Sequence, residues 1–495
     1  MSNKLIQSLS TEQNKRGLTA KGAKSNVSSL NACVDLFGQV GSMRGREDSQ
    51  LVQVFSAAFG ENPLKALKIL FWLRDIRGGA GERRAFRVIL RHLANSHTLA
   101  VEKNLNLIPE FGRWDDYFVL QGTPVWEDVV KAVTNQLLED VDAKQPTLLA
   151  KWMPSINTSS EKSRKLARYF AARLGWSEKQ YRQTLARLRG KIKIVEQLIC
   201  SGEWDKVVYE HVPSRALALY RKAFRKHDEG RYDQYLRDVE SGKKEIKAAT
   251  LYPYDLLRQA FENKSDKSDK TTDLQWKALP NYVEPFNGMV VADVSGSMGS
   301  CGYHYYGRAG QIEPIYVAIS LAMYIAERNT GPWKDHFMTF STNPEFVQIK
   351  GSTLTERALN VNRANWDGTT DLQAAFELIL ETALRNKVSE EDMPKMLIII
   401  SDMQFNTACR SNKRTNFEQI EKRYKKAGYQ RPQLVFWNVN AYGKDSPVTV
   451  DDVGTCLVSG CSPSILKSVL SQEILTPVDV MNATIESERY SVVTF

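Results

Sequence analysis

Apolar residues along this chain follow two different periods. Between residues 48 and 259 they recur every three or four positions, in amphipathic segments separated by short polar turns. The clearest segments are residues 63–76, 82–94, 126–138, 161–174 and 214–225. Hardly any alternating strand pattern interrupts them, so we expect stacked helical hairpins, which are repeat-like although no fixed period recurs.

The second half of the chain contains the short, continuous apolar runs that are typical of buried parallel strands. These runs are residues 288–292, 336–341, 395–400, 433–439 and 454–459. Helical patterns fall between most of them, which predicts a doubly wound α/β domain. The polar, low-complexity stretch NKSDKSDKTTD, which begins at residue 263, is the best candidate for a linker between the two patterns.

We therefore predict a multidomain protein that combines an all-α part and an α/β part. An N-terminal arm (1–46), rich in Ser, Asn, Gly and Lys, fits either an ordered segment or a flexible one that folds on RNA. A helical module (47–262), a linker (263–279) and an α/β domain (280–495) follow it.

The first predicted strand of the α/β domain leads directly into a set of oxygen ligands. In VADVSGSM (residues 291–298), a carboxylate and two hydroxyls occupy alternate positions at the end of an apolar run: Asp293, Ser295 and Ser297. The carboxyl ends of strands are where open α/β sheets bind ligands. The alternative is that both serines only cap a helix, and the strand patterns on either side argue against it.

Two later segments complete a candidate metal site. The turn GTTD (residues 368–371) supplies Thr370, and Asp371 can cap the helix that follows. Another apolar strand, MLIII, is followed by Ser401 and then by Asp402. Oxygen ligands with few charges suit Mg²⁺, and Mn²⁺ or Ca²⁺ remain open alternatives. Because Thr369 precedes Thr370, which threonine faces the metal is also open.

Charge is distributed unevenly between the two halves. Residues 1–250 carry 42 Lys and Arg against 28 Asp and Glu, a net charge of +14, whereas the rest carries 25 against 29, a net of −4. An electropositive half is the expected feature of a protein that binds a polyanion. Residues 161–200 alone hold eleven basic and three acidic residues, with aromatic residues between them that either stack on bases or face a helical core.

A glycine-rich turn, RDIRGGAGERR (residues 74–84), lies between two predicted helices. Its glycines permit close backbone approach, and the helix after it offers free N–H groups to a phosphate. The alternative is a tight helix-helix turn with solvated arginines. The candidate RNA-contacting residues at this turn and in the basic stretch are Arg74, Arg77, Arg83, Arg84, Arg87, Lys162, Arg164, Lys165, Arg168, Arg173, Arg182, Arg187, Arg189, Lys191 and Lys193. Trp152 is either a stacking platform or a core anchor.

The residues give little support to catalysis, secretion or membrane insertion. Six scattered cysteines without a Cys-x-x-Cys pair indicate reduced thiols in the cytoplasm. No run of eighteen apolar residues and no signal-peptide core is present. The few histidines are dispersed and no nucleophile-base set is visible, so we expect binding without turnover.

Three helical motifs, RDIRGGAGER, GRWDD (residues 112–116) and VPSRA (residues 212–216), together with the terminal metal motif, narrow the interpretation. This combination resembles the TROVE architecture of Ro ribonucleoproteins and a related family with the same layout, from about residue 48 to the C-terminus. In Ro proteins, HEAT-like helical repeats form a ring that is closed by a von Willebrand factor A domain with a metal-ion-dependent adhesion site. This chain differs in its second threonine and in an inserted aromatic loop, SCGYHYYGR (residues 300–308), which either covers the metal or is a surface loop.

The resemblance implies a noncatalytic RNA-binding scaffold for small structured noncoding or misfolded RNA. It further implies that Asp293, Ser295, Ser297, Thr370 and Asp402 hold a divalent ion, Mg²⁺ or another, that grips an anionic partner such as a nuclease or other protein. We expect a cytoplasmic monomer without membrane contact. The alternatives are a metal-dependent protein-protein interaction module without RNA and a metal-dependent nuclease.

Overall fold

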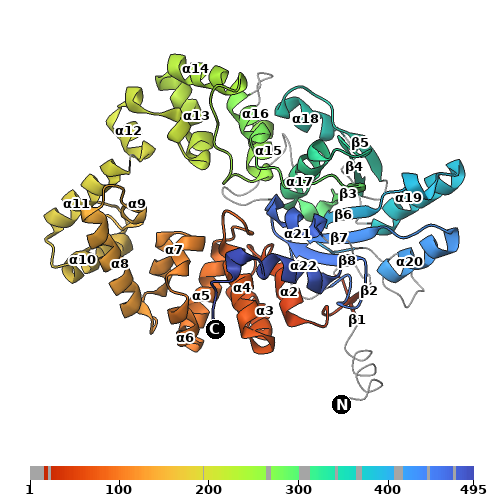
Figure 1. The fold of residues 1–495 in the computed structure, drawn as a ribbon, viewed down its shortest axis with the longest axis horizontal. Helices are drawn as coiled ribbons and strands as arrows, with labels where there is room; N and C mark the ends of the chain where they lie inside the picture. Colours follow the sequence, from red (N-terminus) through yellow and green to blue (C-terminus); the bar gives the residue numbers. More distant parts are fainter. Residues whose placement is uncertain are drawn as a thin grey trace.

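Helices of the first half of the chain follow one another around an arc (Figure 1). The computed structural model describes residues 16–19, 24–192, 194–262, 269–299, 313–340, 344–363, 371–405, 416–442, 446–471 and 475–495. The helices of the arc are α3 (Asp48–Glu61), α4 (Pro63–Arg74), α5 (Arg84–Ser96), α6 (Thr98–Lys103), α7 (Leu107–Phe111), α8 (Trp126–Asp142), α9 (Leu149–Trp152), α10 (Glu161–Arg173), α11 (Glu178–Lys191), α12 (Val195–Ser201), α13 (Ser214–His227), α14 (Glu229–Glu240), α15 (Pro253–Glu262) and α16 (Lys270–Lys277). Short 3-10 helices lie between some of them: η1 (Trp114–Leu120), η2 (Trp204–Lys206) and η3 (Tyr209–His211).

Local capping residues explain where several of these helices begin. Asn62 ends α3, and its side chain accepts a hydrogen bond from the N–H of Lys65 in the first turn of α4 (3.0 Å). Ser160 caps α10, and Ser177 forms a capping box with Gln180 at the start of α11. None of the helices within the described ranges is long and apolar enough to cross a membrane.

The second half of the chain forms a six-stranded sheet, in the order β5-β4-β3-β6-β7-β8. The strands are β3 (Gly288–Asp293), β4 (His336–Phe340), β5 (Glu345–Gln348), β6 (Met396–Ser401), β7 (Gln433–Asn438) and β8 (Thr455–Ser459). All neighbours pair in parallel except β4 and β5. The five predicted strands are confirmed. The sequence analysis missed β5, a four-residue edge strand with three exposed residues.

Helices cover the sheet of the α/β domain, as predicted. They are α17 (Pro314–Arg328), α18 (Leu354–Val361), α19 (Leu372–Asn386), α20 (Asn416–Ala427), α21 (Leu466–Leu470) and α22 (Pro477–Ile485), with short 3-10 helices η4 (Gly296–Met298), η5 (Glu390–Asp392), η6 (Pro463–Ile465) and η7 (Glu488–Tyr490). Helix α17 packs against β3, β4 and β6, whereas α22 packs against β8. Every residue of β3 and β6 is buried, as expected for central parallel strands covered on both faces.

The direction of the chain across the sheet reverses between β3 and β6. From β3 the chain moves outward to β4 and β5, and it then returns to β6 on the other side before continuing to β7 and β8. Such a switch point leaves a crevice at the carboxyl ends of the two strands, where α/β proteins bind ligands. The register pairs Ala292 with Ile400, so the last residues of β3 and β6 lie next to each other.

The α/β domain contacts both ends of the helical arc (Figure 1). Near the start of the arc, α4 packs against α22 and η7, and near its end α15 packs against α17 and α18. The carboxylate of Asp75, which is fully buried, accepts hydrogen bonds from Arg489 Nη2 (2.8 Å) and from the hydroxyl of Tyr490 (2.9 Å) in η7. The helices and the sheet domain therefore form one closed arrangement.

The described part of the predicted N-terminal arm is a packed element, which fits the ordered alternative for these residues. A two-stranded hairpin, β1 (Arg16–Leu18) and β2 (Lys24–Asn26), precedes helix α2 (Ala32–Val40), which packs against β8. Asn26 exchanges two backbone hydrogen bonds with Ser446, and the hydroxyl of Ser459 donates to the carbonyl of Phe37 (2.6 Å). The apolar residues of α2 are buried by this packing against β8. The composition of the arm did not indicate that such a contact exists.

The end of the predicted linker is also structured. Residues 263–268 lie outside the described residues, but Asp269 caps α16 and forms a partly buried ion pair with Arg221 of α13. Trp276, which is 1% exposed, donates from its indole nitrogen to Glu327 of α17 (2.7 Å). Helix α16 therefore takes part in the packing between the two halves. The low-complexity sequence before it does not indicate that the helix ends in a buried tryptophan.

The glycine-rich turn joins the first part of the arc directly to its last part. The hydroxyl of Tyr252, just before α15, donates to the carbonyl of Ala80 (3.2 Å). Gly81 has a φ of 68°, and a Cβ there would lie 1.6 Å from the Tyr252 hydroxyl. The close approach of Tyr252 therefore requires a glycine at position 81, and no phosphate is needed to explain it.

We expect Gly81→Ala to lower the stability of the protein more than Gly175→Ala. Gly175 has nearly the same φ, 67°, but nothing lies within 4 Å of its hypothetical Cβ. An alanine in this backbone region costs about 1–2 kcal/mol, and overpacking against Tyr252 adds about 1–3 kcal/mol. The measurement is the free energy of unfolding in urea for both variants.

Removing the hydroxyl should relieve part of this additional cost, so Gly81→Ala combined with Tyr252→Phe should be more stable than the two separate losses imply. Equal losses for Gly81→Ala and Gly175→Ala would show that the contact with Tyr252 contributes nothing.

Candidate functional site

The edge of the sheet at the switch point brings together the first predicted ligand, Asp293, and the end of β6. Asp293 is fully buried at the last position of β3. Its Oδ1 accepts a hydrogen bond from the backbone N–H of Ser295 (2.9 Å), and its Oδ2 accepts one from the hydroxyl of Ser401 (2.6 Å). Ser401 was not among the predicted site residues, although its place one residue before Asp402 on the neighbouring strand end was visible in the sequence.

The two predicted serines lie on one tight loop after β3. The hydroxyls of Ser295 and Ser297 are 3.2 Å apart, and the single turn η4 holds them. Ser295 is fully buried. The loop ends at Gly299, whose φ is 93°, and the carboxylate of Glu313 lies so close that a Cβ on this glycine would be 1.7 Å from its oxygen. Both features fix the conformation of the loop.

Asp402, the predicted ligand from the third loop, is 1% exposed and lies beside Asp293. Its Oδ1 accepts a hydrogen bond from the N–H of Gln404 (3.0 Å). Burial, together with the charge of Asp402, raises the pKa of Asp293 to about 6. Two buried carboxylates repel each other, so either a proton or a cation between them lowers their free energy.

The donor set of this edge fits a hard divalent cation. The site combines two carboxylates with two hydroxyls, and such oxygen ligands are preferred by Mg²⁺ and Ca²⁺. Within the described ranges, no group of three or more His, Cys, Asp or Glu residues could hold a metal by itself. Binding at this edge would therefore also depend on hydroxyl ligands, namely Ser295 and Ser297. Thr369, Thr370 and the aromatic loop 300–308 lie outside the described residues.

The predicted phosphate ligand at the start of the glycine turn is instead part of the core. Arg74 is 2% exposed, and its Nε donates to the buried carboxylate of Asp116 (2.8 Å). Arg87 pairs with the other oxygen of Asp116 (2.6 Å) and with Asp115. The guanidinium of Arg74 is buried and pairs with a carboxylate 42 residues later in the chain. The prediction that Arg74 contacts RNA is therefore wrong.

The other arginines of the turn differ in how they are used. Arg84 pairs with Asp48 (2.5 Å) and donates to backbone carbonyls, so its charge is largely satisfied. Arg77 is well exposed, and among the described residues its guanidinium forms one ion pair, a long contact of 3.5 Å with Glu110. Arg83 is exposed and forms no ion pair within the described ranges. Partial desolvation by the neighbouring protein lowers the pKa of the Arg83 guanidinium, and so do the nearby charges of Arg113 and Arg87.

Most candidate cations of α10 and α11 are committed to partners in this chain. Three of them pair with glutamates: Lys165 with Glu161, Arg168 with Glu178, and Arg173 with Glu127. Three others donate to backbone carbonyls: Arg164, Arg189 and Lys191. Lys193 lies outside the described residues. Local charge counting could not detect these partners, because several of the acids and carbonyls lie far away in the sequence.

The remaining candidates of this stretch are exposed and form no ion pair in the described part of the chain. They are Lys162 on α10, and Arg182 and Arg187 on α11. Sequence reasoning missed similar residues nearby: Lys179 on α11, and Lys222 and Lys226 on α13. The run RKAFRKH at the end of α13 was the signal that could have identified the last two.

The aromatic residues of the basic stretch mainly serve the core. Phe170 and Tyr181 are fully buried, and the hydroxyl of Tyr181 donates to the carbonyl of Pro154 (2.9 Å). Trp152 is partly exposed, but the guanidinium of Arg113 already covers its ring at 3.9 Å from the centroid. These three rings are therefore not free platforms for bases.

Comparison with known proteins identifies two family matches that meet near the boundary between the halves. Residues 19–120 and 125–284 match the family described as "Domain of unknown function (DUF2828)". Residues 287–491 match the family described as "Domain of unknown function (DUF7788)". The chain is also 28% identical over 512 residues to "Uncharacterized protein L728" of Acanthamoeba polyphaga mimivirus, an alignment that covers 94% of this chain and 87% of the viral protein.

The buried carboxylate pair should make the metal-free protein less stable as the pH rises. In the folded protein the pKa of Asp293 is raised to about 6, so the folded state binds this proton more tightly than the unfolded chain does. Stability is therefore lost as the pH rises from about 4 to above about 6. Asp293→Asn should remove this loss and stabilise the protein by about 2–3 kcal/mol at neutral pH in EDTA.

Urea unfolding at pH 5 and pH 7.5 in EDTA tests this expectation. Asp451→Asn, which changes an exposed carboxylate, is the control and should leave the pH dependence of the wild type unchanged. If Asp293→Asn destabilised the protein at both pH values, the acid would be important only for its hydrogen bonds to Ser295 and Ser401.

Proposed function

The chain belongs to the family described as "Domain of unknown function (DUF2828)", and we propose that it is the noncatalytic RNA-binding scaffold of a ribonucleoprotein. The proposed ligand is small structured noncoding RNA or misfolded RNA. The helical arc would bind the phosphates, and the edge of the sheet would hold a divalent cation for an anionic partner.

The proposal rests on one observation: basic side chains on the arc that nothing in the described protein neutralises. Lys162, Lys179, Arg182, Arg187, Lys222 and Lys226 are exposed and form no ion pair there. Many neighbouring cations, by contrast, pair with glutamate or aspartate. A polyphosphate that covers the unpaired cations gains free energy from the release of counterions.

Helix α11 presents several of these cations on the same side. Lys179, Arg182 and Arg187 lie on the solvent side, while the opposite side of the helix is buried through Tyr181, Leu185 and Leu188. Glu178, the acid in the first turn, is already paired with Arg168 of α10. The exposed side of α11 thus keeps a net positive charge that is available to a nucleic acid backbone.

The architecture supports a likeness to the TROVE and Ro layout. An arc of helices returns to an α/β domain, and the Asp-x-Ser-x-Ser motif lies at the switch point of the sheet (Figure 1). We propose on this basis that the arc is a HEAT-like repeat and that the sheet domain is of the von Willebrand factor A type. Mg²⁺ bound there would offer an open coordination position to a carboxylate or phosphate oxygen of a partner.

A second candidate is a metal-dependent protein-protein interaction module that does not need RNA. The observation in its favour is that Asp293, Ser295 and Asp402 are buried together at one edge of the sheet. In this case the residues of the sheet edge would orient the cation, and an acidic residue of a protein partner would complete its coordination.

We expect Lys179→Ser, Arg182→Ser and Arg187→Ser together to weaken RNA binding and to change its salt dependence. Each lost phosphate contact reduces the magnitude of the slope of log K against log salt by about 1. The slope of the triple variant should therefore be smaller than that of the wild type by up to about 3. The measurement is fluorescence anisotropy with a labelled hairpin RNA that carries a single-stranded 3′ tail, over a series of salt concentrations.

The matched control removes three cations that are already paired with glutamates: Lys165→Ser, Arg168→Ser and Arg173→Ser. This variant should change the salt slope by less than the α11 variant does. The proposal fails if the wild type retains no RNA even at low salt, or if the two triple variants behave alike.

Metal chelation should separate the two candidate functions. For an RNA scaffold, EDTA and Asp293→Ala should leave the RNA affinity within about twofold, because the cations on α11 lie on a different element from the metal edge. The same treatments should release an anionic protein partner. Cleavage of the hairpin RNA during incubation with Mg²⁺ would contradict the noncatalytic part of the proposal.

A further inference from the structure

Three arginines lie together where helix α5 meets η1. Arg83 comes just before α5, Arg87 lies one turn later on the same side of the helix, and Arg113 comes just before η1. The Nη2 atoms of Arg87 and Arg113 contact the same oxygen, Oδ2 of Asp115, at 2.7 Å and 2.6 Å. We call Arg83, Arg87 and Arg113 the arginine cluster, because their guanidinium groups are neighbours.

Two members of the arginine cluster are held in one orientation. The Nε and Nη2 atoms of Arg113 donate to the two oxygens of Asp115 (2.8 Å and 2.6 Å), and its guanidinium lies over the ring of Trp152. The Nε of Arg87 donates to the buried carboxylate of Asp116 (2.6 Å). Because both guanidinium groups are already ordered, an anion that binds them costs little side-chain entropy.

The arginine cluster carries more positive charge than the carboxylates within it neutralise. Asp115 and Asp116 together serve three arginines, because the buried Arg74 also pairs with Asp116 (2.8 Å). Arg83 adds a fourth positive charge. Four guanidinium groups therefore face two carboxylates, and two positive charges remain without a counterpart.

Arg83 is the member of the cluster whose charge has no partner in the described part of the protein. Its side chain is exposed and forms no ion pair or hydrogen bond there. The adjacent acid, Glu82, pairs with Arg44 instead (2.5 Å). Partial desolvation lowers the pKa of Arg83, and the charges of Arg113 and Arg87 lower it further. An anion bound between these groups would relieve their repulsion.

The donors that remain in the cluster suit a phosphate group. About a quarter of the side chain is exposed in Arg87 (24%) and in Arg113 (25%), and among the described residues neither Nη1 atom forms a hydrogen bond. Guanidinium donors match the geometry of phosphate oxygens. A terminal phosphate carries a charge of about −2 near neutral pH, whereas each phosphate within a strand carries one negative charge. The surplus of the cluster therefore fits a terminal phosphate better.

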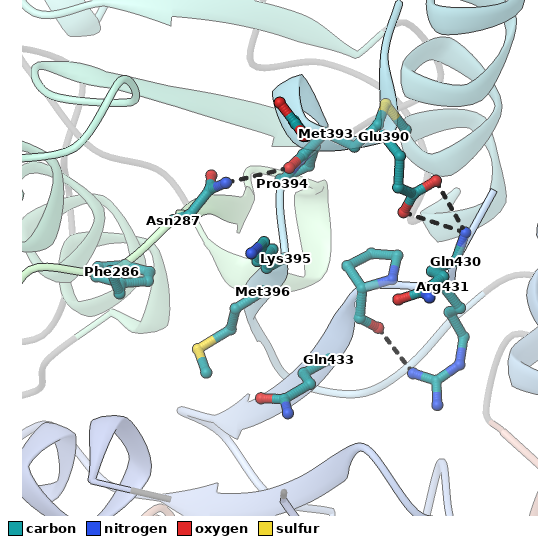
Figure 2. Close-up of a pocket in the computed structure, with 12 residues that line it drawn as sticks. Phe286, Asn287, Glu390, Met393, Pro394, Lys395, Met396, Gln430, Arg431 and Gln433 are labelled. Carbon is teal, nitrogen blue, oxygen red and sulfur yellow. Dashed lines mark hydrogen bonds between the residues drawn. The ribbon is translucent and has the colours of Figure 1, made fainter. Parts of the chain in front are cut away.

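A groove of about 590 Å³ at the starts of β3, β6 and β7 shows no such surplus (Figure 2). Its lining carries Glu390 and Glu391 against Lys395 and Arg431. Glu390 and Arg431 are also occupied with backbone groups, as the dashed lines in Figure 2 show. The arginine cluster is therefore the stronger candidate for binding an anion.

We propose that the arginine cluster binds a terminal phosphate of the RNA. This inference rests on the RNA-binding function proposed above and adds to it a preference for one kind of RNA end. Arg83, Arg87 and Arg113 donate hydrogen bonds to the oxygens of the terminal phosphate, whereas the cations on α11 bind phosphates along the strand. The cluster holds the RNA end without changing it chemically.

Three single-stranded RNAs of one sequence test the proposal by fluorescence anisotropy on the full chain. They are about twelve nucleotides long, carry an internal fluorescein, and have a 5′-phosphate, a 3′-phosphate or hydroxyls at both ends. The wild type should bind at least one phosphorylated RNA about fivefold or more tightly than the hydroxyl RNA. Comparison of the two phosphorylated RNAs shows which end the cluster binds.

Arg83→Gln should remove most of this preference and should leave the affinity for the hydroxyl RNA within about twofold of the wild type. Arg83→Lys keeps the charge and should retain part of the preference. The matched control is Arg385→Gln on α19, which changes an exposed arginine without an ion pair in the described part of the chain. It should keep the full preference, and urea unfolding checks that each variant is folded.

The inference is overturned, and the proposed RNA binding survives, if the wild type binds all three RNAs equally or if Arg83→Gln keeps the preference. A complete lack of RNA retention would overturn both. A phosphoserine peptide adds a further outcome. If it binds the wild type but not Arg83→Gln, while the RNA ends make no difference, the cluster belongs to a phosphoprotein and the inference is wrong.

Discussion

The apolar ends of the helical arc must be removed from water, and this constraint determines the rest of the structure. Stacked helices bury their apolar faces against neighbours, so the first and last helices of such a stack need another cover. The sheet domain provides it on both sides, through β8 and α22 near α2 and through α17 and α18 near α15. Closing the arrangement in this way places the glycine turn beside Tyr252 and the buried Asp75 beside Arg489.

Ion pairs within the helical half determine which arginines of the glycine-rich turn can contact a ligand. In the sequence, three arginines of this turn look like ligands for phosphate. In the structure they form ion pairs instead: Arg74 with Asp116, Arg84 with Asp48, and Arg87 with Asp115. The charge that remains available lies instead on the outer side of helices such as α11. The distinction between cations that hold the fold and cations that face solvent is therefore a matter of long-range pairing.

Local patterns in the sequence predicted the helices and the central strands well. β3 and β6 are apolar on both faces because helices cover both, and a continuous apolar run is a strong signal for this situation. The adjacency of Asp293 and Asp402 also followed from their positions at the ends of two such strands. The edge strand β5 escaped prediction because only Val347 of its four residues is buried.

What sequence reasoning could not supply were contacts between distant segments. The polar start of α16 suggested a linker, and only the structure shows that its end carries a buried tryptophan bonded to Glu327. The arm before residue 46 was similarly judged by composition, whereas α2 owes its order to β8, more than 400 residues later in the chain. Asp293 and Ser401, 108 residues apart, are joined by the same kind of distant packing.

The position of α16 also bears on how this architecture was inherited. The helix belongs to one family match by sequence, but Trp276 forms hydrogen bonds with two residues of the other match: its indole nitrogen donates to Glu327, and its carbonyl accepts from Arg328. A gene fragment that ended between the two matches would encode a protein in which the indole of Trp276 and the apolar residues beside it are exposed to water. We therefore expect the two parts to be inherited together, and not to recombine freely with unrelated domains.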